Sequence, residues 1–359
     1  MPLSGVHLNE PAGAPPRLSV VVPAFRCGHQ LRAGLLALLA STLPRTEWEL
    51  IVVDDGSPDD TGDVARQFAD RVIRTGETPR GPAHARNCGA HEARAEVLLF
   101  VDADIRVQPD VLARVVAHFA ADDRLSAVFG CYDDDPAAPG VVSQYRNLLH
   151  RFVHIDGAGE ATTFWAGIGA VRRAAFAAIG GFDAARYPRP QIEDIDLGYR
   201  LRDAGGTLRL DPSVCGTHLK RWTLASMLRT DLRDRAIPWM RLLIERRAVL
   251  ASGPLNIARR EQLLVGTMAL ALLLGATAIV TNRATWLVGA VLCLTVIIIG
   301  NWRLFRWFAD VRGVPFALAA VPLRLLFYVV SVAGAAWTLV STPFIRRRGI
   351  AAAAVAPIA

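Results

Sequence analysis

Residues 96–110 read EVLLFVDADIRVQPD, an apolar run followed by a short acidic pair. The run 97–101 contains no polar residue, which is typical of a strand buried on both faces of a sheet. It ends in Asp102 and Asp104, separated only by Ala103. Such a pair either forms a solvated turn or holds a divalent cation over a diphosphate, because Mg²⁺ and Mn²⁺ take few carboxylates and complete their shell with phosphate oxygens and water.

The segments before this run alternate between strand and helix patterns. We expect strands over 18–25, 48–57, 71–74 and 96–104, and helices over 29–42, 60–70 and 81–95. This alternation predicts an α/β fold whose mostly parallel sheet is covered by helices on both faces. Ligands of such sheets bind beyond the carboxyl ends of the strands. Four acidic residues at strand ends should therefore converge on one edge: Asp54, Asp55, Asp102 and Asp104.

Two further segments each have a structural and a functional interpretation. VVDDGSPDDTGD, residues 52–63, is ordinary turn chemistry, or it places Asp55 where it accepts a hydrogen bond from a nucleobase N–H. RGPAHARNCGA, residues 80–90, is a plain helix start, or it directs free backbone N–H groups and Arg86 toward a phosphate. Neither segment alone distinguishes its two interpretations.

Five segments in this order resemble family 2 glycosyltransferases of GT-A fold. They are VVVPAF, ELIVVDDGSPDDT, ARNCGA, LLFVDAD, and GGFD followed by EDIDLGYRL. The resemblance covers residues 17–222 and implies a Rossmann-like GT-A domain that binds a nucleotide sugar.

The resemblance implies nucleotide-binding roles for Pro23, Phe25, Asp54, Asp55, Arg86 and Asp102. Phe25 would lie against the base and Asp55 would bond to it, with Asp54 beside it. Arg86 would approach the diphosphate. The family's usual Tyr-Asn is Phe25-Arg26 here, so the base stays open, with a UDP-sugar as the favoured donor.

The resemblance also implies a metal and a base. Asp104 would be the main ligand of Mg²⁺ or Mn²⁺, with Asp102 beside it and His218 as a late metal or phosphate contact. Asp194, next to Glu193, matches the general base, although acids also favour a helix N-terminus. The metal would stabilise the charge on the leaving nucleoside diphosphate, and one displacement would invert the anomeric centre.

Apolar segments follow the predicted catalytic domain. Residues 262–281 and 284–300 lack charges and are each about long enough to cross a bilayer, which takes roughly 20 residues. Residues 314–340 are interrupted by Pro315, Pro322 and Arg324, and we expect membrane contact there without deciding on a crossing. The expected organisation is a disordered leader (1–16), the GT-A domain (17–222), basic amphipathic interfacial helices (223–261), a membrane segment with two or three transmembrane helices (262–342) and a basic, Ala-rich tail (343–359).

The positive charge is concentrated before the first apolar segment. Residues 220–261 hold ten basic and four acidic residues, almost the whole net charge of +7. Their position favours anionic membrane lipids as partners and not nucleic acid. Basic residues flanking the apolar segments predict a multi-pass protein of the inner or plasma membrane with a cytoplasmic catalytic domain. The five cysteines have neither disulfide nor metal spacing.

These features favour single transfer of a sugar to a membrane-associated acceptor, such as a polyprenyl phosphate or a lipid-linked glycan. A processive polysaccharide synthase is the alternative, but RAIPW carries Pro238 where such synthases of the family carry Arg. A membrane-anchored nucleotide-sugar-binding protein without turnover is a third possibility, which the retained Asp102, Asp104 and Asp194 disfavour. A dinucleotide-binding oxidoreductase is remote, because no G-x-G-x-x-G follows the first strand.

Overall fold

The computed structural model describes residues 15–249 and 258–353. The predicted leader therefore lies outside the described residues except for its last two positions. Residues 250–257 of the predicted interfacial segment and residues 354–359 of the predicted tail lie outside them as well.

The first half of the sheet is parallel, as the sequence predicts. Its strands follow the order β3-β2-β1-β4, and they are β1 (Leu18–Ala24), β2 (Trp48–Asp54), β3 (Arg71–Arg74) and β4 (Val97–Val101). All residues of β2 and β4 are buried. Because both faces of these strands are apolar, the sheet is stable only when helices cover both sides.

The second half of the sheet is mixed. β8 (Ile168–Arg172) is antiparallel to β4 and to β6 (Leu125–Tyr132), while β9 (Thr207–His218) is parallel to β6. Two short strands, β5 (Ile105–Val107) and β7 (Gly159–Ala161), pair antiparallel with β9. The predicted parallel arrangement therefore extends to β4, and the antiparallel pairs lie beyond it.

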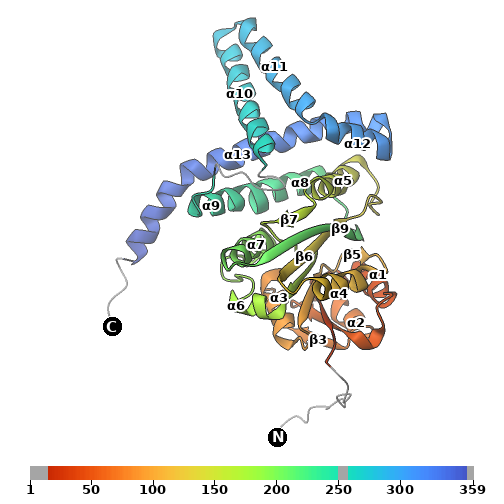
Figure 1. The fold of residues 1–359 in the computed structure, drawn as a ribbon. Helices are drawn as coiled ribbons and strands as arrows, with labels where there is room; N and C mark the ends of the chain where they lie inside the picture. Colours follow the sequence, from red (N-terminus) through yellow and green to blue (C-terminus); the bar gives the residue numbers. More distant parts are fainter. Residues whose placement is uncertain (1–14, 250–257, 354–359) are drawn as a thin grey trace.

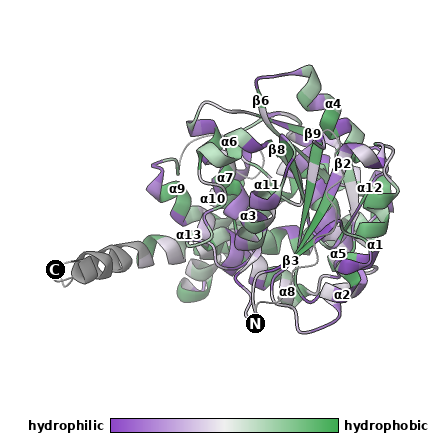
Figure 2. Cartoon of the chain, turned by 90° about the horizontal axis from the view of Figure 1, so that it is seen from below, coloured by the Kyte–Doolittle hydropathy of each residue, from purple (hydrophilic) through white to green (hydrophobic). Residues whose placement is uncertain are grey.

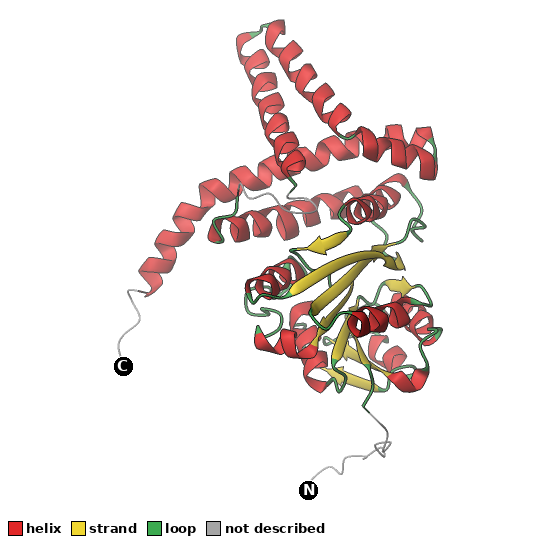
Figure 3. Cartoon of the chain, in the orientation of Figure 1, coloured by secondary structure: helices red, strands yellow, loops and turns green. Residues whose placement is uncertain are grey.

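Two helical layers enclose the sheet (Figures 1 and 3). One apolar core contains residues of α1 (Gly28–Leu39), α2 (Thr61–Arg66) and α4 (Val111–Ala121), and the other contains residues of α3 (Pro82–Glu92), α6 (Arg173–Ala178) and α7 (Glu193–Asp203). Val20 and Val22 belong to the first core and Val21 to the second, as the period of two in a strand requires. Figure 2 shows the strands as mostly hydrophobic and the helices as both hydrophobic and hydrophilic.

A layer of helices separates this domain from the C-terminal helices (Figure 1). It contains α5 (Val141–Asp156), α8 (Leu224–Arg229), the π-helical turn η2 (Thr230–Ala236) and α9 (Ile237–Glu245). A proline inside a helix usually interrupts or ends it. Here the chain stays helical through Pro238, and the turn before it is π-helical. A proline has no backbone N–H donor and its ring clashes with the carbonyl four residues earlier, and a wider turn accommodates both effects.

The C-terminal helices are α10 (Arg259–Thr281), α11 (Ala284–Gly300), α12 (Trp302–Arg312) and α13 (Val314–Ala353). The two apolar segments form a helical hairpin, with Asn282 in a left-handed conformation between α10 and α11. By length and composition α10 and residues 314–341 of α13 can each cross a membrane, and α11 with α12 forms a third candidate bent by 57°. The α10–α11 hairpin projects away from the catalytic domain, and α13 runs across its base (Figures 1 and 3).

A buried polar cluster joins these helices. The guanidinium of Arg324 on α13 donates to Asn301 Oδ1 at 2.7 Å and to Glu261 Oε2 at 2.7 Å. The hydroxyl of Tyr328 donates to the same Glu261 oxygen at 3.1 Å. Arg324 interrupts an apolar stretch in the sequence, and the structure pairs its charge at the point where α10, α13 and the α11–α12 junction meet. Such pairing is what makes a buried charge tolerable.

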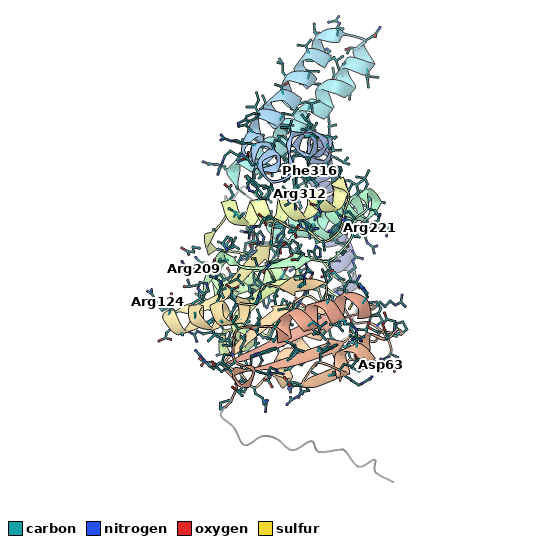
Figure 4. All side chains as sticks on the ribbon, turned by 90° about the vertical axis from the view of Figure 1, so that its right-hand side faces the viewer. Asp63, Arg124, Arg209, Arg221, Arg312 and Phe316 are labelled. Carbon is teal, nitrogen blue, oxygen red and sulfur yellow. The ribbon has the colours of Figure 1, made fainter. Side chains whose placement is uncertain are left out.

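A second contact fixes the C-terminal helices to the α/β domain. Arg312, at the end of α12, donates to Gln144 Oε1 of α5 at 3.0 Å and to the Asp134 carbonyl at 2.6 Å. Figure 4 shows Arg312 and Phe316 at this junction, with Asp63 at the opposite end of the catalytic domain.

We predict that Arg324→Gln lowers the free energy of unfolding by about 3–5 kcal/mol, because Glu261 is left as a buried charge without its cation. Thermal unfolding in detergent, followed by tryptophan fluorescence, measures this loss. Arg303→Gln is the matched control, since Arg303 pairs with Asp156 at the surface and its side chain is 71% exposed. That variant should stay within about 1 kcal/mol of wild type. Equal losses in both variants would contradict a structural role for the cluster.

Candidate active site

A cavity of about 760 Å³ lies at the carboxyl edge of the parallel strands. It brings together nine of the ten residues that the sequence predicts for the site: Pro23, Phe25, Asp55, Arg86, Asp102, Asp104, Glu193, Asp194 and His218. They come from four strand ends and two helix N-terminal halves. The parallel order of β2, β1 and β4 explains why residues far apart in the sequence meet here.

Asp54 is the tenth residue, and the structure does not bring it to the cavity. Its side chain is buried and accepts hydrogen bonds from the Ser57 amide at 2.9 Å and from Arg74 at 3.0 Å. Asp54 therefore stabilises the turn after β2. A strand end places consecutive residues on opposite faces, so only Asp55 of the two faces the cavity.

Asp55 holds the loop that leads into α3. Its carboxylate accepts hydrogen bonds from the Thr75 hydroxyl at 2.7 Å, the Arg80 amide at 3.0 Å and the Gly81 amide at 2.7 Å. Gly81 has φ +92°, and a Cβ there would meet the Pro188 carbonyl oxygen at 2.5 Å. Asp55 therefore faces the cavity and also holds the loop that forms one of its walls.

Phe25 and Arg26 form the rim of the cavity. The Phe25 ring is 38% exposed, and the Arg26 guanidinium lies 5.1 Å from its centroid. Arg26 has a positive φ of 50° and its amide donates to Ser57 Oγ at 3.1 Å. An exposed aromatic ring at a strand end is a suitable surface for stacking a planar base.

Arg86 links three elements at the bottom of the site. It donates to Asp102 Oδ1 at 2.6 Å and to Glu193 Oε1 at 3.0 Å, and its side chain is 6% exposed. Burial alone would lower the pKa of Arg86, but Asp102 and Glu193 raise it above its ordinary value, so the guanidinium stays charged. The sequence predicted that Arg86 approaches the diphosphate. In the structure, its guanidinium is hydrogen-bonded to the two carboxylates of Asp102 and Glu193.

Glu193 and Asp194 open α7 and differ in their surroundings. Glu193 is buried and also accepts from the Gln191 amide at 2.9 Å. Asp194 is half-buried and accepts from the Ala166 amide at 3.2 Å and the Ile195 amide at 2.8 Å. Burial, together with the neighbouring Glu193, raises the pKa of Asp194 to about 7. A carboxylate with this pKa is a suitable general base near neutral pH.

Asp104 and His218 meet on the other side of Asp102. His218 Nε2 lies 3.4 Å from Asp104 Oδ2, while its Nδ1 lies 2.6 Å from Asn147 Oδ1. Burial alone would raise the pKa of Asp104, but the hydrogen bond and charge of His218 hold it below its ordinary value. For Asp102, burial raises the pKa and Arg86 opposes this.

The donor set fits a cation that shares its ligands with a phosphate. Among residues 15–249 and 258–353, no group of three or more His, Cys, Asp or Glu side chains is arranged to hold a metal by itself. One side of such a cation would be held by the carboxylate oxygens of Asp102 and Asp104 and by one ring nitrogen of His218. Mg²⁺ and Mn²⁺ accept such incomplete protein sites when substrate phosphates and water complete the shell.

An aromatic group that the sequence analysis missed forms the opposite wall. Tyr132 stacks on His218 with ring centroids 4.3 Å apart and also contacts His150 and Trp165. Burial lowers the pKa of His154, which stacks on His150, to about 4, so its ring is neutral. These residues lie on β6, α5 and the loop before β8, and no motif or spacing in the sequence connects them.

Comparisons with known proteins agree with this arrangement. Residues 19–180 match the model of the family described as Glycosyl transferase family 2. Validoxylamine A glucosyltransferase of Streptomyces hygroscopicus subsp. jinggangensis is 30% identical over 223 residues, 53% of this chain and 52% of that protein. Probable glycosyltransferase YdaM of Bacillus subtilis is 26% identical over 219 residues, 55% of this chain and 50% of that protein. The chain thus matches about half the length of these relatives.

A solved structure extends the likeness in fold to the C-terminal helices. Mannosyltransferase PcManGT from Pyrobaculum calidifontis, in complex with GDP-Man and Mn²⁺, superposes with a TM-score of 0.57 at 17% identity. The match covers 90% of this chain and 88% of that one. Residues 19–180 are therefore similar to family 2 glycosyltransferases, and the chain has the GT-A fold that the sequence predicts.

We predict that Mn²⁺ binds weakly to the protein alone and about tenfold more tightly with a nucleoside diphosphate, because the two share a shell and their coupling is reciprocal. Titration of free Mn²⁺ by electron paramagnetic resonance, with and without UDP or GDP, measures this coupling. Asp104→Ala should abolish it. Asp63→Ala, at an exposed position of α2, should leave it intact. Equal Mn²⁺ affinity with and without nucleotide would contradict a shared site.

Proposed function

We propose that this protein is an inverting glycosyltransferase that moves a sugar from a nucleotide-diphosphate donor to a membrane-associated acceptor. The observation that carries the proposal is that one cavity contains the rim residue Phe25, the acidic pair Asp102 and Asp104, and the half-buried Asp194. A base-stacking surface, oxygen ligands for a cation and a carboxylate with a pKa of about 7 are the parts that such a transfer needs.

The donor would lie along the carboxyl edge of the sheet. Phe25 and Asp55 would contact the base, and the diphosphate would reach Asp102 and Asp104. A divalent cation, when bound there, would stabilise the negative charge on the leaving diphosphate. Arg86 would act indirectly, since its bonds to Asp102 and Glu193 set the positions of the carboxylates on either side.

Asp194 would take the proton of an attacking hydroxyl; for a lipid phosphate, which is already ionised, it would orient the attacking oxygen. The amides of Ala166 and Ile195 hold its carboxylate, and Glu193 beside it is already bonded to Arg86. Attack from the Asp194 side and departure of the diphosphate toward Asp104 place nucleophile and leaving group on opposite faces of the sugar. A single displacement of this kind inverts the anomeric centre.

The acceptor would be membrane-associated, such as a polyprenyl phosphate or a lipid-linked glycan. The support is that α10 and α13 are long and apolar enough to span a membrane and pack directly behind the helical layer next to the cavity. The basic residues around the apolar helices support a cytoplasmic catalytic domain at the inner or plasma membrane and contact with anionic lipids. Pro238 stands where processive synthases of the family carry Arg, and this favours single transfer of the sugar over processive synthesis.

The direct test is a hydrolysis and transfer screen on the full-length protein in membranes. Radiolabelled UDP-sugars and GDP-mannose are offered with and without Mn²⁺, and label is followed into nucleotide-free sugar, organic-soluble lipid and water-soluble polymer. The proposal expects Mn²⁺-dependent turnover and labelled lipid. Label found only in long polymer would favour the processive synthase, and the absence of turnover with every donor would favour a non-catalytic binding protein.

We predict that Asp194→Asn lowers donor hydrolysis at pH 7 by about 10²–10⁴-fold, because general-base assistance has this size. The carboxylate acts only when deprotonated, and its pKa is about 7. The wild-type rate should therefore rise about tenfold per pH unit below that value and level off above it. Initial rates of hydrolysis between pH 5 and pH 9 test this, with Asp183→Asn as an acidic control outside the cavity. A wild-type profile without this rise would contradict the assignment.

A further inference from the structure

A second cavity, of about 340 Å³, lies between the catalytic domain and the C-terminal helices. Its walls come from α5, from η2 and α9, and from α10 and α13, the two candidate membrane spans. Most of the lining is apolar, with Leu149 and Val153 on α5, Met240 on α9, Val265 on α10 and Phe327 on α13. An apolar cavity with a few convergent polar groups is the usual form of a small-molecule site.

This cavity adjoins the donor cavity. His150, His154, Arg235 and Trp239 line both. The two cavities therefore adjoin along these four side chains. The wall between the two spaces is the place where an acceptor would meet the donor.

Arg235 is the charged residue of this shared wall, and no carboxylate of the described residues forms an ion pair with it. Within the described parts of the chain it forms no ion pair or hydrogen bond, while the other charges of the apolar cavity are paired: Arg146 with Asp231 at 2.7 Å and Glu261 with Arg324 at 2.7 Å. Asp234, next to it in sequence, lies 3.5 Å from Arg189. A cation without an anion on a cavity wall is a site for an anionic ligand.

The surroundings of Arg235 make an added anion favourable. Its side chain is exposed to solvent on the wall that the two cavities share. Desolvation by the surrounding protein, and next the repulsion by Arg146, lower the pKa of Arg235 to about 10, while Asp231 and Asp194 oppose this. A phosphate placed between the two guanidinium groups would offset both effects, since charge-assisted hydrogen bonds from Arg to phosphate are among the stronger ones in proteins.

Arg235 lies on the π-helical turn η2, three residues before Pro238, and lines both cavities from there. α13 packs closely on this turn, because a Cβ added at Gly334 would lie 2.6 Å from Ala236 Cβ. Isolated π-helical turns occur often at functional sites, and here the turn places a cation between two cavities.

From these observations we propose that the apolar cavity binds the acceptor as a phosphate-bearing lipid, with the phosphate at Arg235 and the apolar chain between α5, α9, α10 and α13. This deepens the proposed function and rests on it for the transfer step, but the binding itself requires no turnover. The order of groups matches such a molecule: the apolar walls would hold the chain, and Arg235 would hold the phosphate, whose oxygen would bond to the anomeric carbon on the Asp194 side as the nucleoside diphosphate leaves. Arg235 is thus assigned a positioning role.

Binding to the purified full-length protein in detergent tests this without a donor. The probes are farnesyl phosphate, farnesol, which lacks the phosphate, inorganic phosphate, which lacks the chain, and dioleoylphosphatidylglycerol, a two-chain membrane phospholipid. Trp239 lines both cavities, so intrinsic fluorescence and native mass spectrometry can both report binding. Farnesyl phosphate should bind at least about tenfold more tightly than each of the other three.

The matched variants separate Arg235 from general positive charge. Arg235→Gln should weaken farnesyl phosphate binding about 10- to 100-fold and leave farnesol binding unchanged, because a hydrogen bond to a charged group is lost. Arg235→Lys should retain part of the affinity. Arg233→Gln, an exposed cation of the same turn that lines neither cavity, should bind like wild type. Melting temperatures establish that each variant is folded.

Three outcomes would overturn the proposal. Farnesol binding as tightly as farnesyl phosphate would show that no phosphate is recognised, and an unchanged Arg235→Gln variant would show that Arg235 does not recognise it. Equal binding of dioleoylphosphatidylglycerol would assign the cavity to bulk membrane lipid. If these binding results hold but no donor is turned over in the screen, the proposed function fails and the lipid site stands.

Discussion

The buried contact of Arg86 with Asp102 and Glu193 holds the site together. It connects α3, the end of β4 and the start of α7 across 107 residues of sequence. Arg86 and Glu193 are each only 6% exposed, so removing the cation would leave Glu193 as a buried carboxylate without its partner. This contact therefore fixes the end of β4 relative to the start of α7, which carries Asp194.

The same contact explains the electrostatics of the cavity. Arg86 neutralises only part of the charge of Asp102, Glu193 and the neighbouring Asp194. Burial, and next the charge of Glu193, raises the pKa of Asp194. The remaining negative charge of the carboxylates would attract a cation toward Asp102 and Asp104.

The sequence predicted what depends on local pattern and failed where long-range packing decides. The apolar runs of β1, β2 and β4 predicted a parallel sheet and, because strand ends of such a sheet meet at one edge, the convergence of Asp55, Asp102 and Asp104. The other site residues were predicted from the family resemblance. Sequence analysis placed Asp54 beside Asp55, whereas the alternation of a strand turns Asp54 away toward Arg74. It counted Arg235 among cations facing lipid headgroups, and the π-helical turn before Pro238 directs it into a cavity. Tyr132, His150 and His154 meet only through the packing of α5 on β6, which no local pattern encodes.

The ion pairs of the basic segment determine how the membrane helices sit on the catalytic domain. All four acidic residues between 220 and 261 pair with arginines outside that segment: Asp231 with Arg146, Asp234 with Arg189, Glu245 with Arg186, and Glu261 with Arg324. These ion pairs attach the segment both to the α/β domain and to α13. The apolar cavity therefore keeps a fixed position between the donor cavity and the candidate membrane spans. A lipid loses about 0.8 kcal/mol for each CH₂ group that leaves an apolar environment. Because α10 and α13 form part of the cavity wall, a lipid acceptor could bring its head to Asp194 while its chain stays among apolar side chains, so the reaction would not have to extract it into water.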